Sequence, residues 1–403
     1  MNKSDYIPSP MATEGLLNYP KHGIVYSLAL FAVLTFIFLI PWGNGLWDGL
    51  TRVFGILAFG AAALLFVIDG THKNYTYFHF FALALWSWII LSVTWSADVD
   101  KGVIVAGRAF QIMLLPLLFT LVITNRKSII YAYQSYVLGN IVGSSIIIYN
   151  YLHGIQSPYY NRYTIRNFET DEMSIFLALA IPMAAYLASV LDKKWKRVLN
   201  LFAMPLIIFA IFLTGTRTGS IVAVIGILYW LFTHRNASFR VKASILVIFI
   251  LSIITVASVA PKSSLDRVFS AGKSLKSGNL NYRTVIWKAS IEQWKKSPVV
   301  GVGLGGLGDV LSKEHVNFDA AHNTYIHIMT ESGIVGLTLY LLTLGSVLFL
   351  ILQVPLSEKA FLVTMFMVII ISQLTLHTHL LKSTWFVLTM LSIHAINSRK
   401  AER

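Results

Sequence analysis

The sequence predicts an all-α, polytopic membrane protein with about 12 transmembrane helices and one large helical loop on the outer side. Three observations support this fold class: apolar residues make up 56% of the 403 positions, charged residues only 12%, and the mean hydropathy is +0.67. An ordinary soluble domain carries about twice that charged fraction. A helix needs about 20 apolar residues to cross a bilayer, so the chain is long enough for a dozen crossings.

Apolar segments follow one another along the chain, separated by polar or basic links. Membrane spans are predicted at 24–41, 51–69, 78–95, 103–124, 128–150, 173–191, 198–214, 219–233, 241–259, 334–352, 360–376 and 381–396. Residues 1–260 therefore hold spans one to nine, residues 261–333 form an outer loop, and residues 334–403 hold the last three spans. The final span is short, which is compatible with a tilted or re-entrant helix.

Basic residues are distributed unevenly over the alternate links. With the N-terminus placed in the cytoplasm, 16 Lys and Arg side chains face inward, and the short outward links hold six: Arg52, Lys101, Arg162, Arg166, Arg217 and Lys382. Basic links stay in the cytoplasm, so both termini are expected there.

The same distribution accounts for the formal net charge of +14. A nucleic-acid partner is not expected, because the basic residues punctuate apolar segments instead of clustering on a soluble face. The chain has no cysteine, which excludes disulfides, thiolate nucleophiles and cysteine-ligated metals. The first 20 residues lack the pattern of a cleaved signal peptide.

The outer loop should contain an amphipathic helix. Trp287, Ile291 and Trp294 recur at helical spacing, and Pro298 ends the segment. Either this helix lies at the membrane surface or it packs on the spans; the apolar stripe fits both arrangements equally.

Two polar stretches place an arginine on the outer side. Leu213 to Ser220 is a short link between two spans with Arg217 at its centre and hydroxyl residues around it. A planar guanidinium suits a phosphate or carboxylate, although an interfacial arginine can also reach lipid phosphates. Arg283 begins the amphipathic helix, where a helix N-terminus also favours an anion; surface helices, however, commonly begin with a basic residue.

A third stretch, Ser297 to Val310, contains Gly303, Gly305 and Gly308 in a G-x-G-x-x-G pattern. The dinucleotide fingerprint needs a strand before it and a helix after it in a βαβ unit, and this context is missing. The glycines therefore indicate a flexible or closely packed turn.

The fourth stretch, Ala320 to Leu337, brings His322, Asn323, His327 and Glu331 to the start of a span. An imidazole there can accept a proton from a hydroxyl at neutral pH, although an interfacial histidine is more often structural. The spacing is not H-E-x-x-H, and His377 with His379 offers two ligands without a third. No metal site is predicted.

Arg108 falls inside the predicted span 103–124. A charge at that depth is costly and suggests a functional role. Alternatively, the helix is tilted and Arg108 meets a lipid phosphate near its outer end.

Together these stretches resemble the O-antigen ligase and polymerase superfamily of bacterial envelope glycosyltransferases. The residues that carry the resemblance are Arg217, Arg283 with Trp287, Pro298 with Gly301, Gly303 and Gly305, His322-Asn323 with Tyr325, and Glu331 with Gly333, Gly336 and Leu337. The link before the sixth span departs from the family pattern, which is usually richer in Gly and Asn.

The resemblance implies a GT-C-type inverting transferase that uses neither nucleotide sugar, metal nor cofactor. Its donor would be a glycan on undecaprenyl pyrophosphate, its acceptor a sugar hydroxyl of lipid A core, and its location the bacterial inner membrane, with the active site facing the periplasm. Arg217 and Arg283 would bind the pyrophosphate, and His322 would activate the acceptor hydroxyl. Arg108, Asn323, Glu331, Arg166 and Asp171 are candidate supporting residues.

Three functions remain open from the sequence. A ligase transfers the glycan to lipid A core, whereas a polymerase uses the same donor with a second lipid-linked glycan as acceptor. A transporter of lipid-linked sugars is disfavoured, because such proteins carry polar groups near mid-membrane. Here the polar groups gather on the outer side, with Arg108 as the main exception.

Overall fold

A computed structural model of the chain describes residues 23–47, 49–69, 74–158, 162–233, 247, 282–316 and 318–401, and this part is helical without β-strands. The helices are α1 (Gly23–Leu39), α2 (Gly43–Leu46), α3 (Leu50–Asp69), α4 (Tyr77–Leu91), η1 (Ser92–Trp95), α5 (Val99–Val122), α6 (Arg126–Leu152), α7 (Thr170–Val190), α8 (Lys194–Thr214), α9 (Arg217–Thr233), α13 (Arg283–Lys296), α14 (Leu307–Lys313), α15 (Thr324–Leu352), α16 (Leu356–Gln373) and α17 (Lys382–Ala401).

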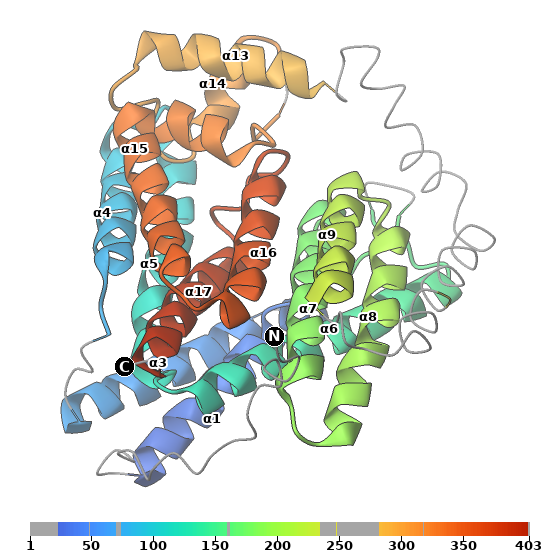
Figure 1. Cartoon of the computed structure of the whole chain (residues 1–403). Coiled ribbons are helices and arrows are strands. Elements are labelled where there is room, and N and C mark those ends of the chain that lie inside the picture. The colour runs from blue at the N-terminus through green and yellow to red at the C-terminus, as the bar shows by residue number, and fades with distance from the viewer. Residues whose placement is uncertain are drawn as a thin grey trace, which may run out of the picture.

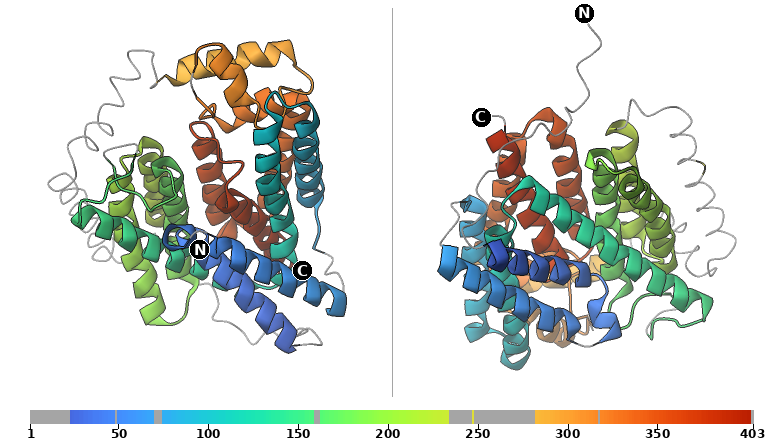
Figure 2. Two further views of the ribbon diagram at one scale, coloured as in Figure 1. Left: turned by 180° about the vertical axis from the view of Figure 1, so that it is seen from behind. Right: turned by 90° about the horizontal axis from the view of Figure 1, so that it is seen from below.

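Two groups of helices flank α16 and α17 (Figure 1). One group contains α4, α5 and α15, and the other contains α6 to α9, with α7 packed against both α8 and α9. Helix α7 is central, because 89% of the residues in its most apolar 18-residue segment are buried, compared with 28% in the corresponding segment of α3. Helices α1 and α3 run across the bundle at a steep angle to α4 and α5 (Figure 2).

Among the residues that the structure describes, seven helices are long and apolar enough to cross a membrane: α3, α4 with η1, α5, α7, α8, α15 and α16. Helices α1 and α9 are apolar but shorter. Large apolar side chains such as Ile24, Val67 and Phe232 are exposed, as expected for a surface that faces lipid. The chain is therefore a multi-pass membrane protein. Every predicted span coincides with a helix except 241–259, which lies outside the described residues.

The links predicted to share a side of the membrane share an end of the bundle. At one end, Lys101 Nζ pairs with Asp319 at 2.7 Å. At the opposite end, Arg126 pairs with Glu358 at 2.9 Å, and Lys400 Nζ donates to Asn74 Oδ1 at 2.8 Å. We call the first end, with the links 92–98, 162–169, 214–217, 318–323 and 374–381, the site end.

Helix α15 differs from the predicted span at its N-terminal end. The helix begins at Thr324, ten residues before the predicted start at 334, and is interrupted at Gly333, where φ is 66° and ψ is −169°. A Cβ atom on Gly333 would overlap the backbone of Val299, so only glycine fits this approach. The predicted boundary corresponds to this break, and the segment before it belongs to the site end.

Candidate active site

Residues 297–306, which we call the glycine loop, dock on α15 where it breaks. Val302 N donates to Thr330 O at 2.9 Å, and Gly303 N donates to Glu331 O at 2.8 Å. The Glu331 carboxylate accepts from Gly305 N at 3.0 Å. These backbone N–H groups bind protein atoms, so the loop is a closely packed turn and not a phosphate cradle.

Helix α13 lies over the site end and packs against α14 and α15 (Figure 1). Its buried residues are Ile286, Ser290 and Gln293. The Trp287 indole donates to Ala321 O at 2.8 Å, and the Trp294 indole donates to Pro298 O at 3.0 Å. These contacts favour the second of the two predicted arrangements, a helix packed on the spans.

His322 directly follows Ala321, the residue that the Trp287 indole contacts. Its backbone is in the left-handed region, with φ at 48°, and its side chain is half-buried. The next residue, Asn323, is the N-cap of α15: its side chain accepts from Ile326 N at 3.1 Å and donates to Leu374 O at 3.1 Å. The Trp287 contact and this cap fix the chain on both sides of the imidazole.

Charged groups from separate helices act on His322. Burial lowers the pKa of His322 below its ordinary value, and the positive charge of Arg283 lowers it further. The Asp171 carboxylate raises this pKa, and His327 lowers it. Arg283 and Asp171 therefore lie within electrostatic range of the imidazole. The net lowering favours a neutral ring, the form that can accept a proton.

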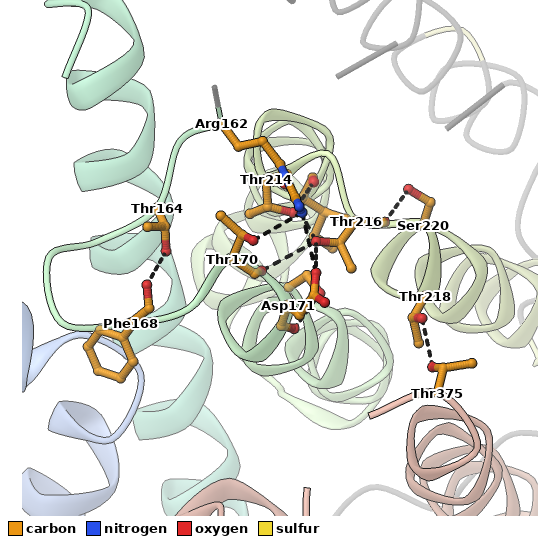
Figure 3. A network of polar contacts seen from close by, with 12 residues as sticks. Arg162, Thr164, Phe168, Thr170, Asp171, Thr214, Thr216, Thr218, Ser220 and Thr375 are labelled. Carbon is orange, nitrogen blue, oxygen red and sulfur yellow. Dashed lines mark hydrogen bonds and ion pairs between the residues drawn. The ribbon is translucent and has the colours of Figure 1, made fainter. Parts of the chain in front are cut away.

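Asp171 belongs to a polar network at the start of α7 (Figure 3). Its Oδ1 accepts from Arg162 Nη1 at 3.4 Å and from Thr216 Oγ1 at 3.1 Å. Arg162 also donates to Thr170 Oγ1 at 3.1 Å, and its side chain is only 7% exposed. Because Arg217 directly follows Thr216, this network fixes the point where α9 and its arginine begin.

The start of α9 is also tied to the link between α16 and α17, residues 374–381. Thr218 Oγ1 and Thr375 Oγ1 are 2.7 Å apart (Figure 3). The same link contacts α15, since Thr324 Oγ1 donates to Leu376 O at 2.7 Å. The stretches that contain Arg217 and His322 are thus joined through this link, and Arg283 acts on His322 from α13.

Residues 202–341 match a family model described as O-antigen ligase. This match supports assignment of the chain to the O-antigen ligase and polymerase superfamily. The matched region contains Arg217, Arg283, His322 and Glu331, all named above.

A protein of Haemophilus influenzae, described as uncharacterized, is 26% identical to this chain over 274 residues. The match covers 61% of this chain and 65% of the relative. The chain thus spans about two thirds of the length of that relative.

The structure places the five candidate supporting residues differently. It brings Asp171 and Asn323 into the site, whereas Glu331 lies beneath the glycine loop, where it also pairs with His327 at 3.3 Å. Arg166 is exposed on the link before α7, and Arg108 is exposed on α5. None of the contacts described above involves either arginine.

Sequence reasoning assigned no role to Arg162, considered Thr216 only as a hydroxyl donor beside Arg217, and considered His377 only as a metal ligand. Arg162 entered only the count of outward charges. Its role depends on an irregular link that returns it to Asp171, and no periodicity in the sequence signals such a return. The pairing of a basic and an acidic residue in one polar link, nine positions apart, was the only available clue.

Within the described ranges, no group of three or more His, Asp or Glu side chains is arranged to hold a metal ion. His327, His377 and His379 lie close together, with ring centroids 5.7 Å apart for His327 and His377 and 4.9 Å apart for His327 and His379. The site offers the imidazole of His322 within electrostatic range of Arg283, which suits proton acceptance next to an anion.

Proposed function

We propose that this protein is a ligase that transfers a preassembled glycan from undecaprenyl pyrophosphate to a sugar hydroxyl of lipid A core. The carrying observation is that His322, Arg283 and the link that holds Arg217 meet at one end of the bundle. The match to a family model described as O-antigen ligase supports a glycan transfer of this kind. The site end would face the periplasm of the inner membrane, with both termini in the cytoplasm.

The proposed reaction needs few protein groups. The acceptor oxygen attacks the anomeric carbon of the donor sugar with inversion, and the bond from that carbon to the pyrophosphate oxygen breaks. The hydroxyl proton passes to neutral His322, and the electron pair leaves with the pyrophosphate. Arg217 and Arg283 would stabilise the negative charge that develops on the pyrophosphate, since one guanidinium group can donate two hydrogen bonds to a phosphate.

The surrounding contacts explain how these groups would be held. The network of Arg162, Asp171 and Thr216 fixes the start of α9, and the Trp287 contact fixes α13 relative to the backbone before His322. His322, Arg217 and Arg283 would therefore be held by elements that these hydrogen bonds fix, which limits the reorganisation needed during the reaction. A donor attached to a membrane lipid would reach such a site from within the bilayer.

The glycan phenotype of a deletion strain tests this proposal. We expect long glycan to accumulate on the carrier lipid, because polymerisation would continue while transfer to core is lost. A strain in which core still carries a single repeat would contradict the ligase assignment and identify a polymerase. Complementation with the wild-type chain should restore full-length glycan on core.

A further inference from the structure

The link between α16 and α17 brings a second histidine against His322. The ring centroids of His322 and His377 are 5.6 Å apart, with the ring planes at 77°. His377 also stacks on His327, with centroids 5.7 Å apart and planes at 14°. His377 thus lies between the proposed base and a histidine that is paired with Glu331.

Several hydrogen bonds fix the position of His377. Asn323 Nδ2 donates to Leu374 O at 3.1 Å, and Thr378 N donates to Thr324 Oγ1 at 2.9 Å. On the other side, the Trp385 indole donates to His379 O at 2.7 Å. These bonds lie on both sides of His377 in the sequence, so its ring is held against His322 by α15 and α17 together.

Two roles are conceivable for His377, a proton relay and a positioning group. Burial, together with the neighbouring His327 and His322, lowers the pKa of His377 to about 3. An imidazole with such a pKa holds almost no proton at neutral pH, so it is a poor acceptor for a proton from His322. The remaining role is to hold the neighbouring ring.

The ring nitrogens agree with this role. The Nδ1 atoms of His322 and His377 are both buried and have no hydrogen-bond partner among the described residues. The orientation of His322 is therefore set by ring packing rather than by a hydrogen bond to Nδ1. An edge-to-face contact at this distance is a favourable aromatic geometry.

We propose that His377 is a positioning residue, whose ring fixes the orientation of His322 and shields it from water so that the neutral imidazole meets the acceptor hydroxyl. This inference rests on the proposed function. The other groups that face His322 are Arg283 from α13, Asp171 from α7 and His327 from α15, and none of them is removed when only His377 is changed.

The test is glycan transfer by purified full-length protein as a function of pH, for His377→Ala and His377→Gln. Removing the ring should lower kcat about tenfold or more, and change KM for the lipid-linked donor less than about threefold. The acid limb of the pH profile is the loss of activity at low pH. In His377→Ala its midpoint should move to higher pH, because water reaches His322 and the pKa of His322 rises toward its ordinary value. The glutamine variant should recover part of kcat.

His315→Asn is the matched control, because His315 is exposed and asparagine tolerates its positive φ. Thermal unfolding identifies the variants that fold. If His377→Ala does not fold, the measurements on His377→Gln decide the test. A folded variant with kcat within twofold of wild type, or with reduced kcat but an unshifted acid limb, would overturn the inference. Lack of transfer by wild-type protein would instead overturn the proposed function.

Discussion

Several charged groups of the site act on the pKa of His322. Burial and Arg283 lower its pKa, while Asp171 raises it, so the imidazole is neutral but remains close to a carboxylate that favours its protonated form. Sequence motifs proposed His322, Arg217 and Arg283 as site residues. They gave no role to Arg162, whose partner Asp171 lies across an irregular link, and they did not place His377 beside His322, because that contact joins distant segments.

The pH dependence of transfer tests this balance. In the wild-type protein, activity should fall at acidic pH with a midpoint below 6.5, because protonated His322 cannot accept a proton. Asp171→Asn removes a charge that raises the pKa of His322, so this midpoint should move to lower pH. The measurement is kcat/KM against pH.

Asp309→Asn is the control, because Asp309 pairs with Lys313 on α14 and does not act on His322. Its profile should match that of wild type. A midpoint that moves upward in Asp171→Asn, or stays in place, would contradict the assigned electrostatics.

At the scale of elements, the glycine loop and the break in α15 support one another. The sequence predicted a flexible or closely packed turn, and Gly301, Gly303 and Gly305 all have positive φ. The partners of the turn were not predictable, because they come from α15 and from the segment after α4. The predicted span boundary at 334 coincides with the break at Gly333, but the helical turns before it were not predicted, because Thr330, Glu331 and Ser332 interrupt the apolar sequence there.

Gly303→Ala should therefore destabilise the protein. A Cβ atom there would overlap the backbone of Ser96, and its φ is unfavourable for alanine, with a cost of about 1–3 kcal/mol. Thermal unfolding in detergent should show a lower midpoint, and transfer activity should fall with it.

Gly345→Ala is the matched control in α15. Nothing lies within 4 Å of a Cβ atom at this position, and alanine favours a helix by about 1 kcal/mol, so stability should be unchanged or slightly higher. Equal melting temperatures for Gly303→Ala and wild type would show that the loop is not tightly packed.

At the scale of the whole molecule, the alternation of links is the strongest agreement between sequence and structure. Links assigned to opposite sides by their basic residues lie at opposite ends of the described bundle. Helix α9 begins at the site end, where Thr218 meets Thr375. Its Tyr229 packs near Phe361 of α16, and α16 begins at the opposite end. Hydropathy and basic residues determine this alternation, whereas helix tilt depends on packing and could not be read from the sequence.

Cysteine labelling tests the assignment of the two ends. The chain has no cysteine, so a single introduced cysteine is labelled without background from other positions. Lys288→Cys on α13 should react with a membrane-impermeant maleimide in cells with a permeable outer membrane. Ser357→Cys at the start of α16 should react only after the inner membrane is opened; both positions are exposed. The reverse pattern would place the site end in the cytoplasm.

Glycan transfer by the purified protein, supplied only with lipid-linked donor and lipid A core acceptor, tests the central claim most directly. We expect wild-type protein and Arg166→Ala to form the glycan–core product without an energy source. His322→Ala, Arg217→Ala and Arg283→Ala should fold but form none. Full activity in His322→Ala, or no transfer by wild-type protein, would contradict a reaction in which arginines hold a lipid pyrophosphate while a histidine accepts the acceptor's proton.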